Sequence, residues 1–90
     1  MPELSQDFII TNKLGMHARA AALLVKTTSQ FSSEVFISAR KQSVNGKSIM
    51  GVLMLAASQG TKIKVTVNGK DASSCMAAIA KIIQNKFGEE

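Results

Sequence analysis

The segment GMHARAA, residues 15–21, contains the only histidine of the chain. Apart from the amino terminus and one thiol, the sequence has no other group of a type that titrates near neutral pH, so acid-base or nucleophilic chemistry would start at His17. Arg19 stands two residues after it and Gly15 two residues before it. Arginine offers forked donors that suit phosphate oxygens, and glycine leaves room for an incoming group. These residues indicate chemistry on an anion, especially a phosphate.

The residues after His17 predict that it lies where a loop enters a helix. Alanines and leucines favour helix from about residue 18 to residue 30. The first N–H groups of a helix attract anions, so the backbone of Ala18, Arg19 and Ala20 is a candidate phosphate site. The same positive helix end disfavours imidazolium, so we expect a neutral, nucleophilic ring. The predicted buried stripe of this helix consists of Ala18, Ala21, Leu24, Val25 and Thr28.

On spacing alone, a plainer interpretation of this pair stays open. Residues two apart on a helix do not share a face, so Arg19 must curl around the helix end to reach a group on His17. His-x-Arg is also a short and common pattern. The alternative is a surface histidine that caps the helix, beside an unrelated surface arginine.

The rest of the chain alternates between strand and helix patterns. Strands are predicted over residues 5–11, 34–38, 40–45 and 61–67, and helices over residues 18–30, 48–55 and 71–87. In the clearest strand, Ile63, Val65 and Val67 face one way while lysines and a threonine face the other. The order β-α-β-β-α-β-α predicts an α+β fold, an open-faced β-sandwich with three helices on one face of a four-stranded antiparallel sheet.

Length and composition limit the possibilities further. Ninety residues, 46% of them hydrophobic, predict a single domain over 1–90. The first residues carry two acids and no apolar run, and no apolar stretch approaches the roughly 20 residues of a membrane span. We therefore expect a cytoplasmic protein with no membrane insertion. The lone Cys75 lies in an apolar helical pattern and is predicted to be a packed thiol, and we expect neither a metal site nor a cofactor.

The net charge of +5 raises the alternative of nucleic-acid binding. An RNA-binding domain would use the exposed sheet face, where Phe36, Lys62 and Lys64 could meet bases. The basic residues are scattered and the chain has no Trp or Tyr to stack on bases, so we expect no nucleic-acid partner. A hydrolase built on His17 is also disfavoured, because no carboxylate, serine nucleophile or metal ligand is predicted beside it.

Two segments resemble a known family. KLGMHARAA resembles the active-site segment of HPr, the histidine-containing phosphocarrier of the bacterial phosphoenolpyruvate-dependent phosphotransferase system, and GKSIMGVLML resembles that family's second hallmark segment. The element order also matches, so the resemblance covers essentially all 90 residues. It implies that Enzyme I passes a phosphoryl group to Nδ1 of His17, which hands it to IIA-type acceptors. It also implies that Arg19 and the N–H groups at the helix start hold the phosphoryl oxygens.

One residue departs from the family pattern, and one branch of the family remains a rival. Ala20 stands where the family usually has proline, and alanine is expected to keep the helix while adding one free N–H. The nitrogen-related phosphocarrier shares Gly-Met-His-Ala-Arg and works with its own Enzyme I and IIA proteins. The segment GKSIMG favours the sugar branch or a regulatory version of it, and the final sugar or acceptor is left open.

The second segment predicts a regulatory serine and a docking surface. Ser48 resembles the serine that an ATP-dependent HPr kinase/phosphorylase modifies in some bacterial groups, and the alternative is that it only caps a helix. A carrier, expected to be a monomer, must dock its partners, so we expect exposed apolar side chains ringed by lysines near His17. The predicted docking residues are Met16, Leu23, Lys26, Lys47, Ile49, Met50, Leu53 and Met54.

Overall fold

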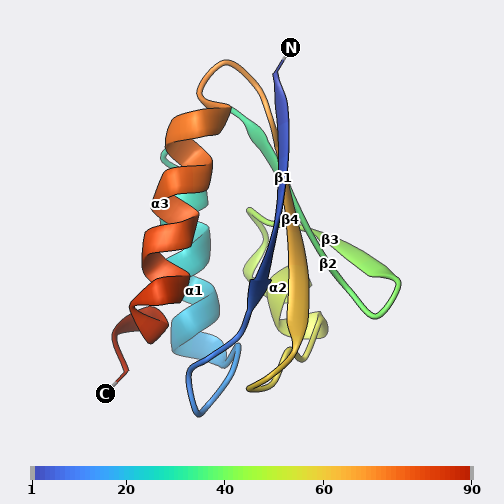
Figure 1. The fold of residues 1–90 in the computed structure, drawn as a ribbon, viewed down its shortest axis with the longest axis vertical. Coiled ribbons are helices and arrows are strands. Elements are labelled where there is room, and N and C mark those ends of the chain that lie inside the picture. The colour runs from blue at the N-terminus through green and yellow to red at the C-terminus, as the bar shows by residue number, and fades with distance from the viewer. Residues whose placement is uncertain (1, 90) are drawn as a thin grey trace.

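The computed structural model describes residues 2–89 and confirms the predicted fold class. The elements are β1 (Glu3–Ile9), α1 (Ala18–Thr28), β2 (Glu34–Ala39), β3 (Gln42–Asn45), α2 (Ile49–Met54), β4 (Lys62–Asn68), α3 (Ala72–Gln84) and the 3₁₀ turn η1 (Lys86–Gly88). The strands pair antiparallel in the order β1-β4-β2-β3. The three helices cover one face of this sheet and leave the other open (Figure 1).

Alternation along the central strands explains the two faces of the sheet. Ile63, Val65 and Val67 of β4 are buried under the helices, whereas Lys62 and Lys64 are exposed, as predicted. The core also contains Cys75, and burial raises the pKa of its thiol, which fits a packed rather than a reactive cysteine. Among residues 2–89, none of the helices is long and apolar enough to cross a membrane.

The buried stripe of α1 differs from the prediction at one end. Ala20 and Ala21 are buried with Leu24, Val25 and Thr28, whereas Ala18 is exposed. Helical Cα–Cβ bonds tilt toward the N-terminus, so the side chain of the first residue points past the helix start rather than onto the sheet. The prediction that Ala18 is buried is therefore wrong.

The chain turns back after α3 earlier than predicted. The helix ends at Gln84 rather than at residue 87, because Lys86 and Phe87 both adopt left-handed backbone with φ near +55°. Such a conformation costs a non-glycine residue about 1–3 kcal/mol. Phe87 offsets part of this cost by burying its ring in the core. As a result, residue 89 returns to the loop that precedes α1.

The carboxylate of Asp71 ties the start of α3 to the segment before β2. It accepts hydrogen bonds from the backbone N–H groups of Ser32 (2.9 Å) and Ser33 (3.0 Å) and from both serine hydroxyls. These bonds, the Ser33 hydroxyl above all, lower the pKa of Asp71 from 3.8 to about 2.

This lowered pKa predicts a pH-dependent stability. Because the folded pKa lies below the unfolded value, the contribution of Asp71 is fully present above about pH 4 and is lost as the pH falls toward 2. We expect Asp71→Asn to be less stable than the native chain at pH 7, with the difference shrinking between pH 4 and pH 2. Urea unfolding over this range measures it, with Asp7→Asn as the control because Asp7 forms only an exposed ion pair with Lys62. A difference that stays constant with pH would contradict the assignment.

Candidate functional site

His17 is the N-cap residue of α1, at the predicted junction of loop and helix. Its backbone is extended, and the first bond inside the helix runs from the N–H of Ala21 to the carbonyl of His17, at 2.8 Å. The N–H groups of Ala18, Arg19 and Ala20 come before that bond, so the helix offers them no internal acceptor. The imidazole makes no capping hydrogen bond. His17 therefore occupies the N-cap position, but the alternative in which its side chain caps the helix is wrong.

A close backbone contact holds the loop that carries His17. Gly15 has φ +67°, and a Cβ there would lie 2.7 Å from the carbonyl oxygen of Ala57 and 2.9 Å from Cα of Ser58. Met16 follows and donates its N–H to the same Ala57 oxygen at 2.8 Å. This contact turns the Met16 side chain into the core, where it is 5% exposed. The prediction of Met16 as a docking residue is wrong, because its side chain cannot reach a partner.

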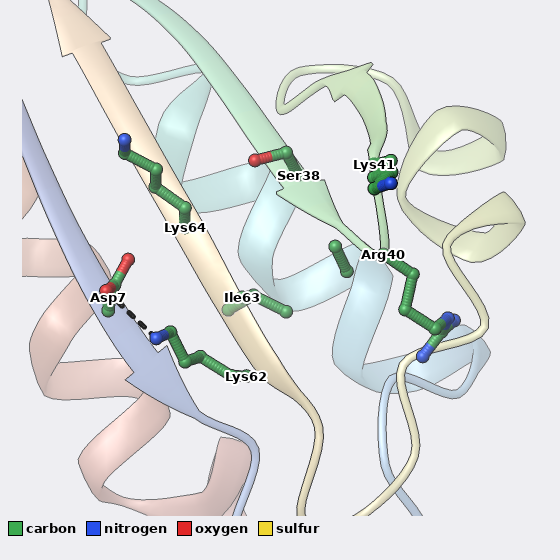
Figure 2. A pocket seen from close by; sticks show the side chains of 8 residues that line it. Asp7, Ser38, Arg40, Lys41, Lys62, Ile63 and Lys64 are labelled. Atoms are coloured by element: carbon green, nitrogen blue, oxygen red, sulfur yellow. Dashed lines mark ion pairs between the residues drawn. The ribbon is translucent and has the colours of Figure 1, made fainter.

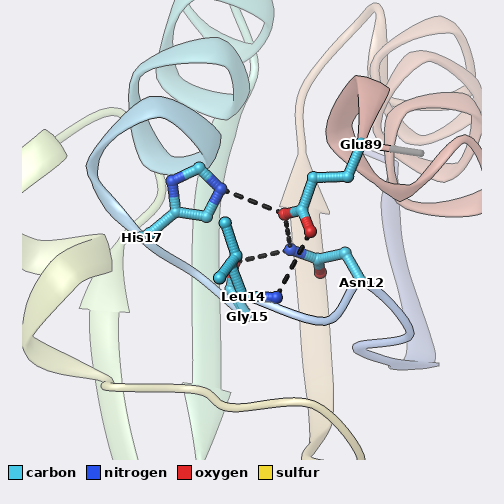
Figure 3. Close-up of polar contacts among 5 residues, drawn as sticks. All are labelled: Asn12, Leu14, Gly15, His17 and Glu89. Atoms are coloured by element: carbon cyan, nitrogen blue, oxygen red, sulfur yellow. Dashed lines mark hydrogen bonds and ion pairs between the residues drawn. The ribbon is translucent and has the colours of Figure 1, made fainter.

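A carboxylate lies against the histidine ring (Figure 3). Oε2 of Glu89 is 3.1 Å from Nε2 of His17 and accepts a hydrogen bond from the Asn12 side-chain amide at 2.5 Å. Oε1 accepts the N–H of Leu14 at 3.2 Å, and the Asn12 amide also donates to the carbonyl of Gly15 at 2.7 Å. Figure 3 shows the second ring nitrogen, Nδ1, pointing away from Glu89.

These contacts keep Glu89 ionised. The Asn12 amide, followed by the Leu14 N–H and the His17 ring, lowers the pKa of Glu89, and partial burial opposes them. The expectation that no carboxylate lies with His17 is therefore wrong. Its partner stands 72 positions further along the chain, and no local pattern in the sequence signals such a contact.

Arg19 lines the same hollow as His17 and Glu89, together with Leu14, Phe87 and Gly88. The two residues therefore border one hollow although they are only two apart in the sequence. The imidazole, the start of α1 and Arg19 thus border one hollow of the surface. This combination supplies a nucleophile and donors for the oxygens of a phosphoryl group.

The family model for the PTS HPr component phosphorylation site matches residues 4–85. The chain belongs to the HPr family. It is 49% identical to the phosphocarrier protein HPr of Xylella fastidiosa strain 9a5c, covering 97% of this chain and 98% of that one. It is 48% identical to HPr of Neisseria meningitidis serogroup A, covering 96% and 97%. The crystal structure of HPr-C-His from Thermoanaerobacter tengcongensis superposes with a TM-score of 0.90 at 43% identity, covering 100% of this chain and 99% of that one. The chain is thus a phosphocarrier of the phosphotransferase system.

Large apolar side chains are exposed on α1 and α2, two helices that contact each other. We call this set of side chains the α1–α2 patch. Met50 and Met54 are the most exposed, at 70% and 65%. The α1–α2 patch consists of Leu23, Ile49, Met50 and Met54.

Three other predicted docking residues differ in how exposed their side chains are. Leu53 is half-buried and packs against the core, so less of its apolar surface is available to a partner than the sequence predicts. Lys26 is exposed on α1, whereas Lys47 is half-buried and donates its Nζ proton to the carbonyl of Phe31 at 2.7 Å. Ser48 caps α2, since its Oγ accepts the N–H of Gly51 at 3.0 Å.

The open sheet face of this HPr has a basic hollow of its own (Figure 2). Lys62 reaches toward Asp7 there, at 3.6 Å, and the Arg40 guanidinium donates to the backbone carbonyls of Leu55 and Ala56. The same face carries one exposed aromatic residue, Phe36. Base stacking would have a single aromatic ring available on this face, and Lys62 and Arg40 already bind groups of the protein itself. These features add no support for the RNA-binding alternative.

Proposed function

We propose that His17 accepts a phosphoryl group on Nδ1 from phospho-Enzyme I and passes it to IIA-type acceptors of the sugar phosphotransferase system. The observation that carries this proposal is the position of the imidazole. It lies at the open N-terminus of α1 without a capping role, and its Nδ1 points away from Glu89.

The neighbours of His17 then receive distinct roles. The Nδ1 lone pair attacks phosphorus, and the bond from phosphorus to the donor breaks so that the donor keeps its electron pair. The guanidinium of Arg19 and the N–H groups of Ala18, Arg19 and Ala20 hold the phosphoryl oxygens. Ala20 adds an N–H that a proline would lack. Moderate stabilisation suits a carrier, because a group held too tightly would not be passed on.

The mass of the intact protein tests this proposal. Incubation with Enzyme I, Mg²⁺ and phosphoenolpyruvate should add one acid-labile phosphoryl group, which a sugar-branch IIA protein then removes. The nitrogen-branch Enzyme I and IIA serve as the comparison, and faster transfer with that pair would assign this HPr to the nitrogen branch. No added phosphoryl group with either Enzyme I would overturn the carrier role.

The α1–α2 patch is proposed as the docking surface, with Lys26 at its edge attracting acidic partners in the cytoplasm. We expect Met50→Gln with Met54→Gln to raise the KM for phospho-Enzyme I about 30-fold, since each methionine buried on docking contributes on the order of 1 kcal/mol. The stability should change little, because both side chains are exposed in the free protein. Steady-state kinetics measure the effect, with Ile9→Gln, an exposed residue of β1, as the control. Equal KM values would exclude the patch.

Ser48 is proposed as a regulatory site for an HPr kinase/phosphorylase. Its half-buried hydroxyl stands next to Ile49 and Met50, so a phosphate there would place negative charge on the docking surface. Incubation with such a kinase and ATP should add an acid-stable phosphate that is absent from Ser48→Ala, and should slow phosphoryl transfer from Enzyme I. Unchanged transfer by the modified protein would leave Ser48 only its capping role.

A further inference from the structure

We propose that Glu89 is a positioning residue that holds the ring proton of His17 on Nε2, so that the nitrogen left unprotonated is Nδ1. This inference rests on the proposed function, since it concerns which ring nitrogen can accept the phosphoryl group. It begins from the 3.1 Å contact between Oε2 of Glu89 and Nε2 of His17.

The chemistry of the two groups decides where the proton lies. A carboxylate only accepts hydrogen bonds, and a neutral imidazole has one nitrogen that donates and one that accepts. The contact between Glu89 and His17 is favourable only when Nε2 carries the proton, because two lone pairs would otherwise face each other. The lone pair of the neutral ring is then on Nδ1, the nitrogen that points away from Glu89 in Figure 3.

Other contacts fix the carboxylate in this orientation. Asn12 is 1% exposed, and its side-chain amide donates both to Glu89 and to the carbonyl of Gly15. The backbone N–H of Leu14 holds the second oxygen of Glu89. The buried Phe87 anchors the turn that delivers residue 89 to this place. Glu89 is therefore held by the loop that carries His17, as partners that orient a reactive histidine commonly are.

The carboxylate also matches the charge that the transfer step creates. When the Nδ1–phosphorus bond forms and the donor leaves with its electron pair, the proton stays on Nε2 and the ring gains a positive charge. The negative charge of Glu89 lies beside that nitrogen and stabilises it. Because the pKa of Glu89 is lowered, the group remains a carboxylate throughout the neutral range.

Nitrogen-15 NMR of the unphosphorylated protein tests the position of the proton without any partner. We expect the Nε2–H signal of His17 to be present in the native chain and in Glu34→Gln, an exposed carboxylate on the open sheet face. In Glu89→Ala its exchange with water should be at least about tenfold faster, because the acceptor is gone. Glu89→Gln keeps an acceptor and should lie between them. A proton found on Nδ1 in the native chain, or unchanged exchange in Glu89→Ala, would overturn the inference.

Phosphoryl transfer supplies the second measurement. We expect Glu89→Ala to lower kcat for acceptance from phospho-Enzyme I about tenfold with KM within about twofold, because one charge-assisted hydrogen bond is lost. Glu89→Gln should lose less, and Glu34→Gln nothing. Equal kcat values for the native chain and Glu89→Ala would overturn the positioning role. If the native chain accepts no phosphoryl group, the proposed function fails, and the NMR result alone decides the role of Glu89.

Discussion

Replacing His17 by alanine should abolish phosphoryl acceptance and leave the fold intact. The chain contains no second imidazole, and this ring is the nucleophile of the proposed transfer. The side chain is part-exposed and makes no capping bond to α1, so its loss removes little packing. Intact mass after incubation with Enzyme I and phosphoenolpyruvate should show no added phosphoryl group, and thermal unfolding should resemble that of the native chain.

Arg19→Ala is the comparison that separates the nucleophile from the group that stabilises charge. It keeps the imidazole, so acceptance should continue but slow roughly 10²-fold, the usual cost of one charge-stabilising donor. The His17→Ala protein should therefore form no phosphorylated product, whereas the Arg19→Ala protein should form it slowly. A phosphoryl group on the His17→Ala protein would contradict the assignment, and its stability to acid would show whether Ser48 had received it.

Gly15→Ala should destabilise the whole domain and displace the site. The left-handed backbone at φ +67° costs alanine about 1 kcal/mol, and a Cβ only 2.7 Å from the Ala57 carbonyl adds about 1–3 kcal/mol of overpacking. Relief requires the loop to move away from Ala57, which breaks the bond from the Met16 N–H and shifts His17. We expect a loss of roughly 3 kcal/mol in urea unfolding and a fall in kcat of up to about 10²-fold.

Gly60→Ala is the matched control for this substitution. Its backbone also has positive φ, at +90°, but no atom of residues 2–89 lies within 4 Å of the position of an added Cβ. The difference between the two variants therefore measures the clash with Ala57 rather than the backbone conformation. Equal losses of stability in the two variants would show that the clash of an added Cβ with Ala57 does not destabilise the fold.

Much of this architecture could be predicted from the sequence, because its signals are local. The alternation of Ile63, Val65 and Val67 indicates a strand with one dry face, and alanines after His17 indicate a helix start. Glu89 lacks such a signal. Its position depends on a left-handed turn at Lys86 and Phe87, and these residue types do not normally favour that backbone.

The burial of Met16 was missed for a related reason. Its neighbours Gly15 and His17 belong to a loop, and a loop pattern does not show which side chains turn inward. The decisive contact is with Ala57, which lies in another segment of the chain. Local propensity cannot report such a contact, whereas packing in the folded molecule determines it.

The contact between His17 and Glu89 also bears on how the molecule folds. It joins residues 72 positions apart, and the bond from Asn12 to Glu89 spans 77. Closing so long a loop lowers the chain entropy before the contact forms, so such pairs tend to form late. On the ribosome, His17 is made early, but its carboxylate arrives only when residue 89 has been added. A nascent chain therefore has the acceptor histidine before it has the complete site, and full acceptor competence should mark the end of folding.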